Sequence, residues 1–108
     1  MRVMTGDIIA IGPGKIELLE AINQTKSIAA AAKSLGMSYR RAWLLVDSMN
    51  QSLNEPAVIT STGGSHGGGT ALTKTGHLLI SLYRRIEQDA VKACQADLEK
   101  LVALVHSN

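Results

Sequence analysis

The chain has 108 residues, of which 45% are hydrophobic and 19% are charged, so it is long enough to bury one core. These proportions exclude a disordered chain, which would carry fewer apolar side chains and more charge. The formal charge of +2 does not by itself indicate a nucleic-acid partner, so that argument depends on where the cations lie.

The single cysteine, Cys94, cannot form an internal disulfide, which agrees with a reducing compartment. The N-terminal residues show no signal-peptide pattern, and no apolar run approaches the roughly 18 residues of a membrane helix. We therefore expect a cytoplasmic protein with no membrane association.

The N-terminal third predicts one short strand and two helices. Residues 7–11 are β-prone and end at the Gly-Pro-Gly turn 12–14, after which residues 15–24 carry apolar side chains at helical spacing. Ser27 is a typical N-cap for a second, alanine-rich helix, which Gly36 ends.

A third helix is predicted from about 39 to 53, with Ser38 as its N-cap. Its inward stripe comprises Ala42, Leu45, Val46, Met49 and Leu53. Two short helices joined by the turn 36–38 predict a helix-turn-helix over about 27–53.

Beyond Pro56 the hydrophobic period changes to two, which predicts a hairpin. Residues 57–73 give two short strands around a glycine-rich tip, and Thr73 then caps a long final helix over about 74–106. The element order predicts a mainly α fold with a small β-hairpin. We expect one domain, 1–108, with a winged helix-turn-helix and a long C-terminal dimerisation helix.

The final helix carries an apolar stripe that is too long for a domain this small to cover. Its members are Leu79, Tyr83, Ile86, Ala90, Cys94, Leu98, Leu101 and Val105. Residues 78–86 are expected to pack on their own domain, whereas the rest calls for a partner, most simply the same helix of a second chain. We therefore expect a homodimer with this stripe as its interface.

Two adjacent arginines, Arg40 and Arg41, begin the second helix of the helix-turn-helix, where the helix dipole does not favour a cation. In such motifs this end enters the major groove of double-stranded DNA, where arginine binds guanine or a phosphate. Ser38 and Tyr39 lie at the same end and are further candidates. A solvated helix face is the alternative, but the turn and the following hairpin favour DNA.

Three other polar residues, Thr25, Ser27 and Lys33, are weaker candidates for phosphate contacts. Trp43 allows two interpretations: a stacking platform for single-stranded nucleic acid, or an anchor of the recognition helix against the hairpin. We favour the anchor.

Four segments carry a family resemblance: GPGKIELLEAI, SIAAAAKSLGMSYRRAWLLVDSMN, EPAVITSTGGSHGGGTALTKTG and LYRRIE. Over roughly residues 8–88 the chain resembles the N-terminal DNA-binding domain of the ModE family of molybdate-responsive regulators, which is itself similar to the winged helix of LysR-type regulators. The resemblance implies a dimeric transcription factor on an inverted repeat. It implies that residues 38–41 begin the recognition helix and that residues 62–69 form the wing.

The wing departs from the family pattern, which commonly has a lysine where this chain reads Ser65-His66. Thr62, Ser65 and His66 are the wing residues for which the resemblance implies DNA contact, and a contact by His66 would depend on pH near about 6.5. Full-length members continue into oxyanion-binding domains. The sequence ends at Asn108 with no match to them, so molybdate sensing is not implied for this polypeptide.

Other classes of site fit the sequence poorly. Gly63 and Gly68 have phosphate-loop spacing, but the required lysine is absent. No nucleophile, base and acid stand together, so we expect no enzyme and no catalytic residue.

The possible metal ligands, His66, His77, Cys94 and His106, lack close spacing, so we expect neither metal nor cofactor. Two alternatives stay open. The chain could be a protein-interaction module on a degenerate winged helix, or a metal- or oxyanion-responsive regulator whose site forms in the dimer. The effector, if one exists, is unknown.

Overall fold

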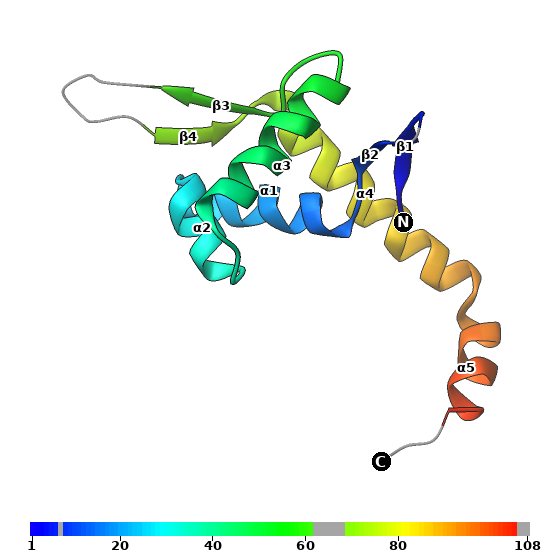
Figure 1. The fold of residues 1–108 in the computed structure, drawn as a ribbon. Helices are drawn as coiled ribbons and strands as arrows, with labels where there is room; N and C mark the ends of the chain where they lie inside the picture. The colour runs from blue at the N-terminus through cyan, green and yellow to red at the C-terminus, as the bar shows by residue number, and fades with distance from the viewer. Residues whose placement is uncertain (7, 62–68, 106–108) are drawn as a thin grey trace.

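The computed structural model describes residues 1–6, 8–61 and 69–105, and Figure 1 shows their arrangement. In chain order the elements are β1 (Val3–Thr5), β2 (Ile8–Ile11), α1 (Pro13–Thr25), α2 (Ile28–Ser34), α3 (Tyr39–Ser52), β3 (Val58–Ser61), β4 (Gly69–Leu72), α4 (Lys74–Ala93) and α5 (Gln95–Ala103). Helices dominate and the later strands form a hairpin, as the sequence predicts.

The core is built around α1, which packs against α2, α3, α4 and β4. Its side chains Ile16, Leu18, Leu19 and Ile22 are fully buried, because they recur at helical spacing on the covered faces. Small residues such as Ala31 on α2 allow the helices to approach closely. This packing holds α3 with its opposite face exposed.

The ends of the helix-turn-helix follow the sequence prediction. The Oγ of Ser27 accepts a hydrogen bond from the backbone N–H of Ala30 (3.0 Å), and the Oγ of Ser38 accepts one from that of Arg41 (3.1 Å). Between the helices Gly36 has φ = 69°, a left-handed conformation that glycine adopts without strain. The predicted caps and turn are confirmed.

The N-terminal segment differs from the prediction of one strand over 7–11. It forms two antiparallel strands, β1 and β2, with Met4 opposite Ile9. Gly6 lies between them with φ = 61°, so the glycine that interrupts the β-prone sequence reverses the chain.

Strands β3 and β4 form the base of the wing. They pair antiparallel, with Val58 opposite Leu72 and Ser61 opposite Gly69. Asn50 on α3 fixes the base of this hairpin: its Nδ2 donates to the carbonyl of Val58 (3.1 Å), and its Oδ1 accepts from the N–H of Ala57 (2.8 Å). Helix α3 and the base of the hairpin therefore hold a defined relative position.

The predicted continuous helix over 74–106 is wrong in one respect: α4 ends at Ala93 and α5 begins at Gln95, with Cys94 in a turn between them. Lys92 lies in the last turn of α4, and Asp97 in the first turn of α5. These charges favour a helix end and a helix start, respectively, so they stabilise the break. Figure 1 shows α5 extending away from the other helices.

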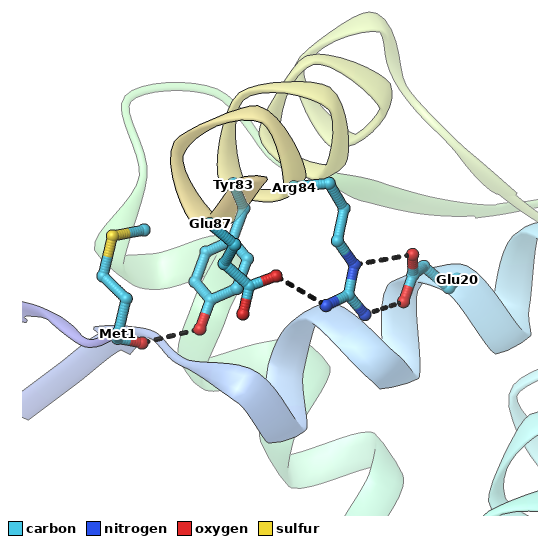
Figure 2. Close-up of polar contacts among 5 residues, drawn as sticks. All are labelled: Met1, Glu20, Tyr83, Arg84 and Glu87. Atoms are coloured by element: carbon cyan, nitrogen blue, oxygen red, sulfur yellow. Dashed lines mark hydrogen bonds and ion pairs between the residues drawn. The ribbon is translucent and has the colours of Figure 1, made fainter. Parts of the chain in front are cut away.

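Polar contacts fix α4 to the rest of the fold (Figure 2). Arg84 donates from Nε to Glu20 on α1 (3.1 Å) and from Nη1 to Glu87 (2.8 Å), and these hydrogen bonds raise its pKa. The hydroxyl of Tyr83 donates to the carbonyl of Met1 (2.7 Å). Burial and the nearby Glu87 raise the pKa of Tyr83. The first half of α4, α1 and the N-terminal segment therefore belong to one packed unit.

Gly76 in α4 offers a test of this packing. An added Cβ would overlap the carbonyl oxygen of Ala57 and lie 3.2 Å from the Cβ of Leu72. We expect Gly76→Ala to lower the free energy of unfolding by about 1–3 kcal/mol, since backbone at the wing base must move. Gly14→Ala is the matched control, because nothing lies within 4 Å of its added Cβ. Urea unfolding would measure both, and equal stability of the two variants would contradict the packing described.

Candidate nucleic-acid interface

Helix α3 has one face in the core and the opposite face in solvent. Ala42, Val46 and Met49 are buried, whereas Arg40 and Leu44 are exposed and lie one turn apart on the opposite side of the helix. Packing on one face thus orients these two side chains outward. The exposed face includes the N-terminal half of α3, the part of a recognition helix that reaches base edges.

The two arginines are not equivalent. Both line a shallow hollow of about 300 Å³ whose other lining residues are Ser38, Leu44 and Leu45. Arg41 also lines a second cavity of about 530 Å³ with Arg2 and Lys15. Arg40 is therefore central on the exposed face, and Arg41 lies on the flank nearest α1.

The second cavity is basic. Three cationic side chains line it, no acidic residue appears among its described lining residues, and the first turn of α1 contributes Pro13 and Gly14. No side chain caps α1 and its first turn holds no acidic residue, so the positive end of this helix faces the cavity. Lys15 is buried and its Nζ donates to the Oγ of Ser48 (3.5 Å), while burial lowers its pKa. The arrangement is suited to a phosphate group.

The other predicted polar contacts come from helix ends. Tyr39 is exposed at the start of α3, and Lys33 is exposed in the last turn of α2. The oxygens of Ser27 and Ser38 already accept the capping hydrogen bonds, so only their hydroxyl protons are available as donors to a phosphate. The hydroxyl of Thr25 has the carbonyls of Ala21 (2.8 Å) and Ser27 (3.0 Å) as alternative acceptors for its one proton, so it is occupied within the protein.

The wing residues Thr62, Ser65 and His66 lie outside the described residues. At the wing base, Trp43 lines a small cavity of about 110 Å³ with Val58 and Thr60 of β3. Trp43 therefore lies on the side of α3 that faces the hairpin, which favours its interpretation as an anchor of α3 against the hairpin. Nearly half of the residue stays exposed.

The residues of the expected dimer interface occupy three environments. Tyr83 is only 3% exposed and is covered by its own chain, and Leu79 is half-buried against the core. Ala90 and Cys94 are exposed near the end of α4. The remaining members, Ile86, Leu98, Leu101 and Val105, are exposed apolar residues.

Within residues 1–6, 8–61 and 69–105, no group of three or more histidine, cysteine or acidic residues is placed to hold a metal ion. In that part of the chain, no helix is both long and apolar enough to cross a membrane.

The family described as "Bacterial regulatory helix-turn-helix protein, lysR family" matches residues 14–77, which include the whole helix-turn-helix and the wing strands. The chain belongs to this family. The resemblance seen in the sequence is therefore confirmed for the fold and for its regulatory class.

Curated relatives agree with this assignment. "Molybdenum transport protein ModE" of Azotobacter vinelandii is 40% identical over 92 residues, which cover 85% of this chain and 34% of that protein. "DNA-binding transcriptional dual regulator ModE" of Escherichia coli K12 is 42% identical over 81 residues, which cover 75% and 31%. The chain thus spans about a third of the length of these relatives.

Solved structures share the winged helix-turn-helix fold. The structure "CbnR_DBD-DNA complex" has a TM-score of 0.61 at 24% identity and covers 86% of this chain and 99% of that one. "BenM_DBD/benA site 1 DNA Complex" has a TM-score of 0.60 at 14% identity and covers 89% and 100%. These likenesses confirm the predicted fold class.

The sequence analysis did not single out three residues of this candidate interface, namely Arg2, Lys15 and Leu44. Arg2 and Lys15 join Arg41 only through the tertiary fold, and no short-range pattern connects them. Leu44 did leave a signal, because it is an apolar residue outside the inward stripe of its helix.

Proposed function

We propose that the chain is the DNA-binding part of a transcriptional regulator that acts as a homodimer on an inverted repeat. The observation that carries this proposal is the exposed face of α3, where Arg40 lies opposite the buried stripe. A side chain in that position reaches base edges when the helix enters the major groove. No cofactor is needed for this activity.

The basic cavity supports a backbone contact beside the groove. Arg2, Lys15 and Arg41 come from three separate segments and surround space of the size of a phosphate group or larger. A DNA phosphate held there would fix the register of α3, since backbone contacts position a protein without reading sequence. The wing, including Thr62 and His66, is proposed to contact the flanking backbone.

Two features support the dimer. The exposed apolar residues of α4 and α5 continue beyond the packed unit, and α5 has no buried residue. A two-fold dimer would place two recognition helices about one DNA turn apart, roughly 34 Å, or a larger spacing. Two solved structures that share this fold are complexes with DNA, which agrees with the same partner here. Because such a regulator acts on the chromosome, we propose the cytoplasm as its compartment.

Selection from a pool of random duplex DNA tests the function. The purified chain is expected to enrich an inverted repeat, with both half-sites needed for full affinity. Binding that is weak, salt-sensitive and blind to sequence would overturn the proposal. It would favour a protein-interaction module that uses the exposed surface of α5.

A further inference from the structure

Leu44 is an apolar side chain on the exposed face of α3, where a polar side chain is expected. It is 48% exposed, lies one turn after Arg40 and is positioned opposite the buried residues Ala42 and Val46. An isolated exposed leucine is ordinary on a protein surface. This one, however, is at the centre of the face that the proposed function presents to DNA, and it lines a hollow with Leu45.

The chemistry of the major groove narrows what could fill that hollow. Base edges there present hydrogen-bond donors and acceptors, and the single apolar group among them is the 5-methyl of thymine. The hollow combines two leucines with the guanidinium groups of Arg40 and Arg41 and the hydroxyl of Ser38. The two leucines make part of its wall apolar, which suits a methyl group next to polar base atoms.

We propose that Leu44 reads thymine in each half-site by covering its 5-methyl group in this hollow. The proposal rests on the proposed function and adds a specificity that polar readout by Arg40 does not supply. Burial of one methyl group away from water increases the affinity for DNA by about fourfold. Leu44 is thus a specificity-determining residue, distinct from the phosphate contacts of the basic cavity.

The test pairs a protein change with a DNA change. In the duplex that the random-pool selection yields, each thymine of a half-site is replaced in turn by deoxyuridine, which lacks only the methyl group. Wild-type protein is expected to lose about fourfold in affinity per affected half-site at one position. Leu44→Ala should bind the thymine and uracil duplexes equally at that position, which makes the two changes non-additive.

Alanine at position 44 keeps the helix, since it has the highest helix propensity and Leu44 is half exposed. Leu78→Ala, the same change at an exposed leucine of α4, should leave the uracil effect intact. A selected site without thymine under α3, or a uracil effect that persists in Leu44→Ala, overturns the inference while the proposed function stands. Failure to enrich any sequence overturns both.

Discussion

Arg40→Ala is expected to abolish most of the preference for the selected site while leaving non-specific binding nearly unchanged. Arg40 is exposed at the centre of the outward face of α3, so its guanidinium is the group best placed for a bidentate contact with guanine. Losing such a contact costs about 1–3 kcal/mol in each half-site. A dimer loses it twice, so the specific affinity should fall by at least about 30-fold. Titration of the selected and a scrambled duplex measures the effect.

Arg41→Ala and Arg85→Ala are the matched variants. Arg41 lines the basic cavity, so its loss should weaken binding to both duplexes equally and lower the slope of log affinity against log salt by about one for each phosphate contact. Arg85, an exposed arginine of α4, controls for net charge alone. If Arg40→Ala weakened both duplexes to the same extent, its assigned role would be wrong and it too would hold a phosphate.

The helix-turn-helix could be predicted from sequence because its determinants are local. Ser27 and Ser38 cap their helices through side-chain contacts three residues away, and Gly36 supplies the left-handed turn. The inward stripe follows from helical spacing. The orientation of Arg40 is then a consequence of which face is buried.

Features that depend on the tertiary fold could not be predicted in this way. The basic cavity brings Arg2 and Lys15 to Arg41 only after the N-terminal segment, α1 and α3 have come together. Tyr83 lies in the segment 78–86, which the sequence predicts to pack on its own domain, but the group that accepts its hydroxyl hydrogen bond is the carbonyl of Met1 at the other end of the packed unit. Periodicity identifies the buried side chain, but it does not say which distant segment will cover it.

The C-terminal helices show the same limit. The continuous apolar periodicity of residues 79–105 predicts one helix. The charges of Lys92 and Asp97 favour a break between two helices, but they are a weaker signal than this periodicity. The result is an extended molecule, with a radius of gyration of 16.7 Å against the ~13 Å of a compact chain of about this length.

Leu101→Glu is expected to convert the proposed homodimer to monomers at micromolar concentration. Leu101 is 58% exposed on α5, among the apolar residues Leu98, Val102 and Leu104, which its own chain leaves uncovered. If these residues contact the same helix of a second chain, the carboxylate of Glu at position 101 would be buried there without a cationic partner. We expect the dimer dissociation constant to rise by at least about 30-fold, which is the effect of losing an interface hot spot. Sedimentation equilibrium measures the change directly.

DNA affinity should follow the oligomeric state. Once the link between two recognition helices is lost, the second half-site no longer benefits from a high effective concentration, so affinity for the full repeat should fall by about 10²–10⁴-fold. Affinity for a single half-site should be unchanged, because α5 lies outside the helix-turn-helix. Gln95→Glu adds the same charge at an exposed polar position of α5 and should remain dimeric. A Leu101→Glu protein that stays dimeric would place the interface on the α4 face around Ile86 instead.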